Sequence, residues 1–84
     1  MELKELSEKI IEFTGKENIS SVSHCATRLR LIVKDKNKVN VSEIEKLNDV
    51  KGIFFDSGQY QIILGDKLTE KIFKYIADMG YTSI

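Results

Sequence analysis

Apolar and polar residues alternate along this chain with two different periods, and each change of period marks an expected element. Across residues 2–14, apolar side chains recur mostly at helical spacing between charged ones, and Gly15 suits the end of a helix. Residues 19–23 form a short apolar/polar alternation, and residues 28–33 alternate clearly with a period of two. The first part of the chain therefore predicts a helix followed by two strands.

The middle of the chain contains a polar loop and the signature of a short helix. Residues 35–38 are all polar, and Ser42-Glu43-Ile44-Glu45 has the spacing of a capping box. This spacing predicts a helix that begins at Ser42 and continues through Leu47. Gly52 lies beyond its expected end.

The last third of the chain predicts a second strand pair and a final helix. Residues 53–55 resemble a strand, residues 56–58 a turn, and residues 59–64 alternate so that Tyr60, Ile62 and Leu64 share a face. Helical spacing returns over residues 68–79 and ends at Gly80.

The predicted element order is α-β-β-α-β-β-α. Strands joined by short connections pair antiparallel, and helices packed on one face of the sheet leave the other face open to water. The order thus predicts an α+β fold, a two-layer sandwich with a four-stranded antiparallel sheet and three helices on one face. Its 84 residues form a single domain, residues 1–84.

Composition excludes several classes of protein. Thirteen basic and thirteen acidic residues cancel, which argues against a nucleic-acid binder. No apolar run approaches the roughly 18 residues that cross a bilayer, so we expect no direct membrane insertion of this domain. With one Cys and one His the chain offers neither an internal disulfide nor a structural zinc site, and we expect a cytoplasmic protein without a metal.

The lone cysteine lies in the segment His24-Cys25-Ala26-Thr27-Arg28-Leu29-Arg30. Positive neighbours lower the pKa of a thiol, and Arg28 and Arg30 share a face if this segment enters a strand. Two guanidinium groups, the Thr27 hydroxyl and amides of a turn over residues 25–27 would all bind phosphate oxygens. The segment suits phosphoryl transfer, although a lone cysteine that is simply a small buried apolar residue remains an alternative.

A cysteine phosphatase is disfavoured by counting. The loops of tyrosine phosphatases place an arginine after Cys and five further residues, where this chain has Leu31. Arg30 falls one residue short, and no glycine lies between.

Two blocks of sequence resemble one known family. Residues 18–35 contain an Asn, the Cys-Ala-Thr-Arg core and alternating apolar positions that end in an acid. Val-Lys-Gly-Ile-Phe-Phe at residues 50–55 and Gly-Gln-Tyr-Gln-Ile-Ile-Leu-Gly at residues 58–65 form the second block. Both are similar to enzyme IIB domains of the bacterial phosphoenolpyruvate-dependent sugar phosphotransferase system, in the glucose/sucrose superfamily. The His-Cys pair looks like its sucrose, trehalose and β-glucoside branch.

The resemblance implies a phosphoryl carrier without a cofactor. Such domains accept phosphate from a phosphohistidine of enzyme IIA as S-phosphocysteine. They pass it to a sugar bound by the membrane-embedded enzyme IIC, at the inner face of the cell membrane. Cys25 matches the phosphocysteine. Thr27, Arg28 and Arg30 match residues beside it, and the two arginines are expected to matter chiefly for transfer to the sugar. The turn that contains Ala26 and Thr27 is expected to bind the phosphate. The end of the chain soon after a helix suggests a domain taken from a longer IIBC chain.

Three further residues have open roles. His24 would either assist transfer or be a surface residue of the subfamily. Gln59 and Gln61 share a face of the last strand, where they would either border the site or be ordinary polar residues of the open face. The sugar itself stays open, with a tilt toward sucrose or trehalose.

A non-catalytic α+β binding or regulatory module is the alternative function. One form is an RNA-binding domain that uses Arg28, Arg30 and Tyr60 on the open face, although Tyr60 is expected on the opposite face. Another is a degenerate IIB-like domain that docks partners without transferring phosphate, against which the intact Cys-Ala-Thr-Arg core argues.

Overall fold

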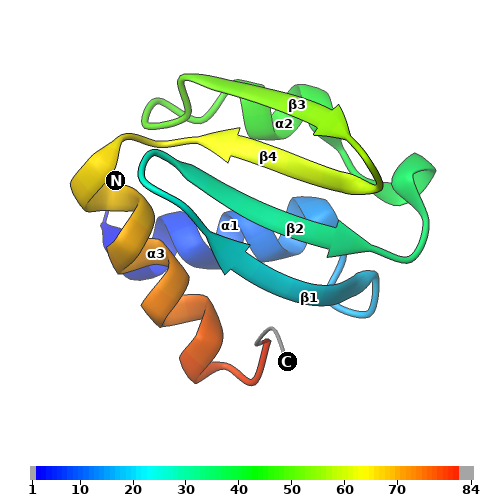
Figure 1. Ribbon diagram of the computed structural model, residues 1–84, viewed down its shortest axis with the longest axis horizontal. Coiled ribbons are helices and arrows are strands. Elements are labelled where there is room, and N and C mark those ends of the chain that lie inside the picture. Colours follow the sequence, from blue (N-terminus) through cyan, green and yellow to red (C-terminus); the bar gives the residue numbers. More distant parts are fainter. Residues whose placement is uncertain (1, 82–84) are drawn as a thin grey trace.

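A computed structural model describes residues 2–81 of the chain, and it has the predicted order of elements (Figure 1). The helices and strands are α1 (Leu3–Thr14), β1 (Ile19–His24), β2 (Arg28–Val33), η1 (Lys36–Lys38), α2 (Val41–Glu45), β3 (Gly52–Asp56), β4 (Gln59–Ile63) and α3 (Asp66–Asp78). The short η1 is a 3-10 helix.

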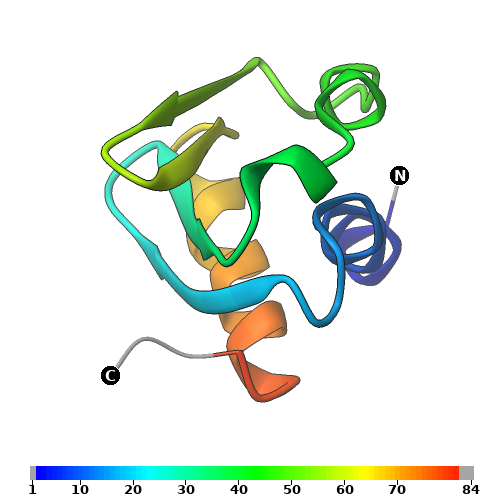
Figure 2. The same cartoon turned by 90° about the vertical axis from the view of Figure 1, so that its right-hand side faces the viewer.

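The four strands form one antiparallel sheet in the order β1-β2-β4-β3. The two hairpins therefore lie side by side, with β2 against β4, and Leu31 is directly opposite Tyr60. Figure 2 shows the sheet on the left and α1 and α2 on the right of the view. The three α-helices cover one face, which confirms the predicted α+β sandwich.

The core lies between the sheet and the helices, and strand alternation divides the side chains between the two faces. Leu29, Leu31 and Ile62 point toward the helices and are fully buried. Tyr60 lies on this buried face too, as expected, and its hydroxyl donates to the Lys36 carbonyl oxygen at 3.2 Å. Each buried Leu or Ile contributes about 1.5–3 kcal/mol, so the register of β2 is strongly determined. Arg28 consequently projects from the open face.

The predicted capping box at Ser42 is wrong. The amide of Ile44 donates to the Asn40 carbonyl oxygen at 3.2 Å, which makes Asn40 the N-cap and places Ser42 inside α2. The amide of Asn40 is itself bound to the Phe13 carbonyl oxygen at 2.7 Å, so contact with α1 determines where α2 begins.

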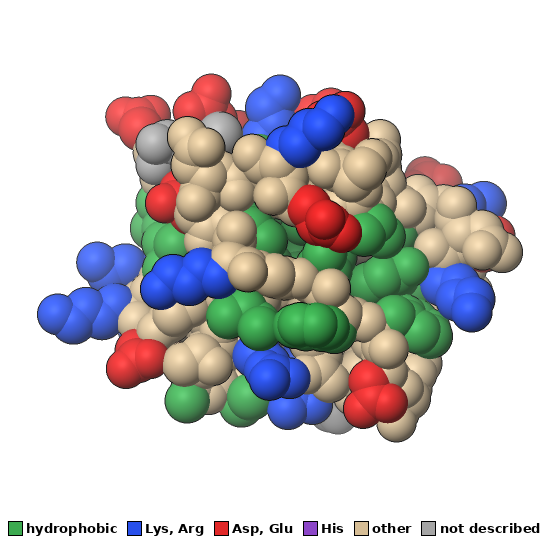
Figure 3. Space-filling view, turned by 90° about the horizontal axis from the view of Figure 1, so that it is seen from above, with side chains coloured by type: hydrophobic (Ala, Val, Ile, Leu, Met, Phe, Trp, Pro, Cys, Tyr) green, Lys and Arg blue, Asp and Glu red, His purple; other side chains and the backbone are tan. Residues whose placement is uncertain are grey.

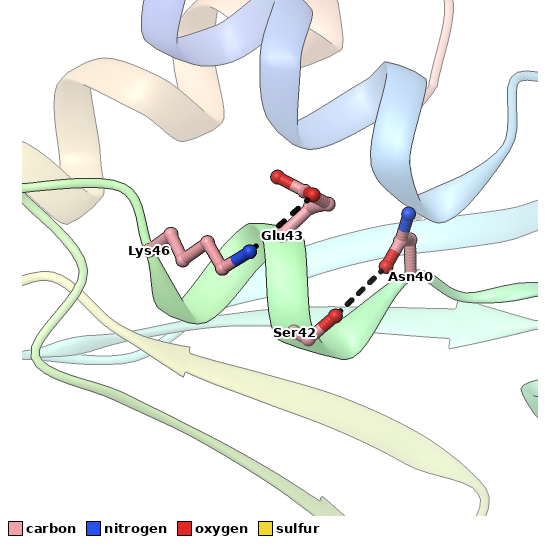
Figure 4. A network of polar contacts seen from close by, with 4 residues as sticks. All are labelled: Asn40, Ser42, Glu43 and Lys46. Carbon is pink, nitrogen blue, oxygen red and sulfur yellow. Dashed lines mark hydrogen bonds and ion pairs between the residues drawn. The ribbon is translucent and has the colours of Figure 1, made fainter.

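Polar side chains cover the surface of α2 instead of capping it. The Ser42 hydroxyl donates to Asn40 Oδ1 at 3.3 Å, and Lys46 pairs with Glu43 at 3.7 Å (Figure 4). The helix ends at Glu45, two residues before the predicted end at Leu47. A second correction concerns the predicted polar loop at residues 35–38, which contains the turn η1.

Two expectations concern the surroundings of the domain. Within residues 2–81, no helix has both the length and the apolar content needed to cross a membrane. The expectation of a longer IIBC chain rested on residues 82–84, which lie outside the described residues.

Candidate active site

The turn between β1 and β2 carries the predicted nucleophile. The Cys25 amide donates to the Arg28 carbonyl oxygen at 3.0 Å, which leaves Ala26 and Thr27 as a two-residue connection. Neither residue adopts a positive φ. Cys25 and Ala26 are exposed and Thr27 is half-buried, so the thiol is accessible and the alternative of a buried apolar cysteine does not hold.

The far side of this turn is fixed by the junction of β4 and α3. The Thr27 carbonyl oxygen accepts hydrogen bonds from the Leu64 and Gly65 amides, at 3.0 and 3.2 Å. Gly65 has φ 93°, a conformation that a glycine adopts without strain. Among the described residues, the amides of Ala26 and Thr27 donate to no protein acceptor. Two N–H groups beside Cys25 are thus free to bind an anion.

Arg30 makes the direct contact with the thiol. Its Nη2 lies 3.4 Å from Cys25 Sγ, because residues 28 and 30 share the open face with Cys25. This hydrogen bond is the main cause that lowers the pKa of Cys25 below its ordinary value. Partial desolvation raises the pKa of the thiol and so opposes this hydrogen bond. The charge of Arg30, a backbone hydrogen bond from Arg28 and the charge of Arg28 lower the pKa further. The site therefore favours the thiolate, the nucleophilic form of cysteine.

Arg28 is held differently, by a buried glutamine. Its Nη1 donates to Gln61 Oε1 at 2.7 Å, and Gln61 is only 6% exposed. The guanidinium also lies 5.9 Å from the centre of the Phe54 ring. A neutral amide fixes the guanidinium without cancelling its charge, which leaves Arg28 available to an anion.

Gln59 stands beside the second arginine. Arg30 Nη1 lies 3.5 Å from Gln59 Oε1, at the outer limit of a hydrogen bond. The structure thus places both glutamines in contact with the arginines. The contact of Gln61 is the shorter one.

His24 lies apart from this cluster. Its imidazole packs on the Phe73 ring of α3, with ring centroids 4.4 Å apart and ring planes inclined by 43°. Phe73 belongs to the helix layer, whereas Cys25 belongs to the open face. Sequence adjacency therefore does not bring the imidazole to the thiol.

Two contributors to the site were missed in the sequence. The first is the pair of backbone amides of Leu64 and Gly65, which bind the Thr27 carbonyl oxygen. The sequence indicated only that Gly65 suits a turn and gave no sign of this contact. Phe54 lies on the open face and is 53% exposed. Residues 53–55 are all apolar, so periodicity could not show which of them faces Arg28.

The edge of the sheet beside Phe54 is apolar. Figure 3 views the molecule from the β3 side and shows hydrophobic side chains gathered between basic and acidic ones. Phe54 and Phe55 of β3 are exposed, at 53% and 42%.

Within residues 2–81, no three His, Cys, Asp or Glu side chains converge as ligands of a metal ion.

Comparison with known proteins identifies the class of domain. The family described as "phosphotransferase system, EIIB" matches residues 8–40. A crystal structure described as one domain of the PTS system IIabc component from Clostridium difficile has a TM-score of 0.93 and 43% sequence identity. That match covers 98% of this chain and 86% of the other. The chain belongs to the EIIB family of the phosphotransferase system, as the resemblance predicted.

Several curated proteins similar to this chain are described as sucrose-specific components. A sucrose-specific EIIBC component of Bacillus subtilis (strain 168) is 53% identical over 74 residues, which are 87% of this chain and 16% of the relative. A sucrose-specific EIIBCA component of Pediococcus pentosaceus is 41% identical over 73 residues, 87% of this chain and 11% of the relative. The chain thus spans less than a fifth of the length of these relatives.

Proposed function

We propose that this domain carries a phosphoryl group on Cys25, between a phosphohistidine of enzyme IIA and a sugar bound by enzyme IIC. The observation that carries the proposal is the exposed Cys25 thiol with the Arg30 guanidinium 3.4 Å from its sulfur. A thiolate is nucleophilic near neutral pH, and a guanidinium beside it binds phosphate oxygens. Both requirements of a phosphoryl carrier thus meet at one place.

In the first step, the Cys25 thiolate attacks the phosphorus of the phosphohistidine. An S–P bond forms and the N–P bond of the donor breaks, so that the bonding electrons return to the imidazole of enzyme IIA. The transferred group carries its charge on the equatorial oxygens. The free amides of Ala26 and Thr27 and the guanidinium of Arg30 are the groups that would bind these oxygens, with the Thr27 hydroxyl beside them.

In the second step, a sugar hydroxyl attacks the phosphorus of S-phosphocysteine. The S–P bond breaks, the thiolate reforms, and the hydroxyl proton leaves to a base outside this domain. Arg28, held by Gln61, would bind the oxygens as the group departs. Arg30 stabilises the thiolate leaving group, for the same reason that it lowers the pKa of the free thiol.

The acceptor is proposed to be sucrose, because the two curated relatives described above are sucrose-specific components. Their EIIBC and EIIBCA descriptions further support an arrangement in which this domain precedes a membrane domain in one longer chain. In this proposal enzyme IIC binds the sugar, and the exposed Cys25 delivers the phosphoryl group to it. The site would then act on the cytoplasmic side of the membrane.

The test is phosphorylation of this domain by phosphorylated enzyme IIA. We expect Cys25→Ser to abolish uptake of the phosphoryl group, measured as protein mass and as loss of phosphohistidine from the donor. Undiminished uptake by Cys25→Ser would contradict the proposal.

A second experiment uses Arg28→Lys, which keeps the charge but loses the planar contact with Gln61. This variant should still be phosphorylated and should transfer to sucrose more slowly when membranes containing enzyme IIC are added, and wild-type transfer would contradict the role of Arg28.

A further inference from the structure

His24 precedes the nucleophile directly, yet its side chain leaves the strand on the other face. His24 lies opposite Leu29 in the β1–β2 register, and Leu29 is fully buried against the helices. Directly opposed residues of an antiparallel pair point to the same face of the sheet. The imidazole is therefore on the helix side, where it contacts Phe73, and cannot share the open face with Cys25.

The contact between these rings is an aromatic one and not part of a hydrogen-bond chain. The centroids are 4.4 Å apart and the planes are tilted by 43°. Within residues 2–81, neither ring nitrogen of His24 is hydrogen-bonded to a protein group. His24 is exposed, and its ring is positioned by the contact with Phe73.

The β4–α3 segment consequently holds the nucleophile's turn at two points. On one side of Cys25, the Thr27 carbonyl oxygen is bound by the amides of Leu64 and Gly65, directly before α3. On the other side, His24 rests on Phe73, two turns further along the same helix. This turn lacks the left-handed residues whose twist matches that of the flanking strands, so such outside contacts help to keep its shape.

We propose that His24 is a positioning residue, whose ring packs on Phe73 of α3 and so fixes Cys25 relative to Arg30. The inference deepens the proposed function and rests on it for the transfer step. His24 does not donate or accept a proton in that step. What it supplies is an aromatic surface, and a phenyl ring supplies the same surface.

The experiment compares His24→Ala, His24→Phe, Phe73→Ala and the double alanine variant, with Tyr75→Ala as the matched control. Tyr75 is an exposed aromatic residue of the same helix, and among the described residues the ring of His24 pairs with Phe73 and not with Tyr75. Two readouts are used: the rate of phosphoryl uptake from phosphorylated enzyme IIA, and the pH dependence of Cys25 alkylation by iodoacetamide. Circular dichroism verifies that each variant is folded.

We expect His24→Ala and Phe73→Ala each to slow uptake by roughly three- to tenfold, the effect of losing one aromatic pair. Each should also move the alkylation midpoint of Cys25 to higher pH, because the contact with Arg30 loosens. The double variant should be no slower than the slower single variant, because both remove one contact. His24→Phe should stay within about twofold of the wild type in both readouts, and Tyr75→Ala should leave both unchanged.

Three results would overturn the inference. Slow uptake by His24→Phe with an unchanged alkylation midpoint would assign a proton-transfer role to the imidazole. Independent, multiplying effects of the two alanine substitutions would show that the rings do not act as a pair. An unchanged alkylation midpoint in His24→Ala would show that the pair does not position Cys25. If the wild-type domain takes up no phosphoryl group, the proposed function fails, while the alkylation profiles still test the role of His24.

Discussion

The two hairpins of this domain are both closed by two residues, but they are built in opposite ways. The β3–β4 turn consists of Ser57 and Gly58, with φ values of 53° and 82°. Such left-handed pairs twist in the same sense as the strands and close a hairpin without outside help. The β1–β2 turn, Ala26 and Thr27, contains no positive φ and is held from outside by the amides of Leu64 and Gly65.

The difference between the turns corresponds to a difference in chemistry. A self-sufficient turn places no demand on the rest of the fold, and the β3–β4 turn is exposed. A turn that depends on distant contacts fixes its amides and its cysteine relative to those contacts. Preorganised N–H groups and charges are what stabilise a phosphoryl group during transfer. The less independent turn is therefore the one suited to be a site.

The largest expected effect comes from giving the β1–β2 turn the sequence of a self-sufficient one. The double variant Ala26→Asn/Thr27→Gly favours left-handed residues at both positions, which reorients both amides while Cys25, Arg28 and Arg30 remain. We expect phosphoryl uptake from phosphorylated enzyme IIA to fall by about 100-fold or more, with little loss of stability, since misplacement by about 1 Å has this effect. Ser57→Asn creates the same Asn-Gly pair in the other turn and should leave uptake unchanged. Undiminished uptake by the double variant would show that the turn conformation does not matter.

The two turns also show how much of the fold and of the site can be predicted from the sequence. The fold followed from periodicity, because polar and apolar residues alternate over residues 28–31 and 59–62 and burial fixes the face of each side chain. Arg28 and Arg30 could be placed together for the same reason. The two hydrogen bonds to the Thr27 carbonyl oxygen could not be predicted, because their donors are backbone amides 37 and 38 residues further along the chain. The predicted start of α2 was wrong for a similar reason. The Phe13 carbonyl oxygen binds the amide of Asn40, and this distant contact overrides the local capping signal at Ser42.

The second prediction compares a thiol in each turn as a function of pH. Because the pKa of Cys25 is lowered, its thiolate is present at lower pH than that of a free cysteine, and the alkylation rate should reach half its plateau below about pH 8.5. Arg30→Gln removes the main cause, so its midpoint should move to higher pH. A Ser57→Cys substitution in a Cys25→Ser background places the only thiol beside Asp56 in the other turn, where the midpoint should not be lowered. Equal midpoints for the wild type and Arg30→Gln would exclude Arg30 as the cause.

The smallest effect is expected from two matched glycine substitutions, Gly58→Ala and Gly65→Ala. Both glycines have positive φ, at 82° and 93°, so an alanine at either position should lower the free energy of unfolding by about 1 kcal/mol or more, measured by urea denaturation. The variants should differ in their effect on the site. Relief of strain at residue 65 shifts the amide that binds the Thr27 carbonyl oxygen, so Gly65→Ala should also raise the alkylation midpoint of Cys25. A β-carbon at residue 58 meets no neighbour within 4 Å, and Gly58→Ala should leave the midpoint unchanged. If both variants lose stability but neither moves the alkylation midpoint of Cys25, the hydrogen bonds to the Thr27 carbonyl oxygen stabilise the fold and do not set the geometry of the thiol.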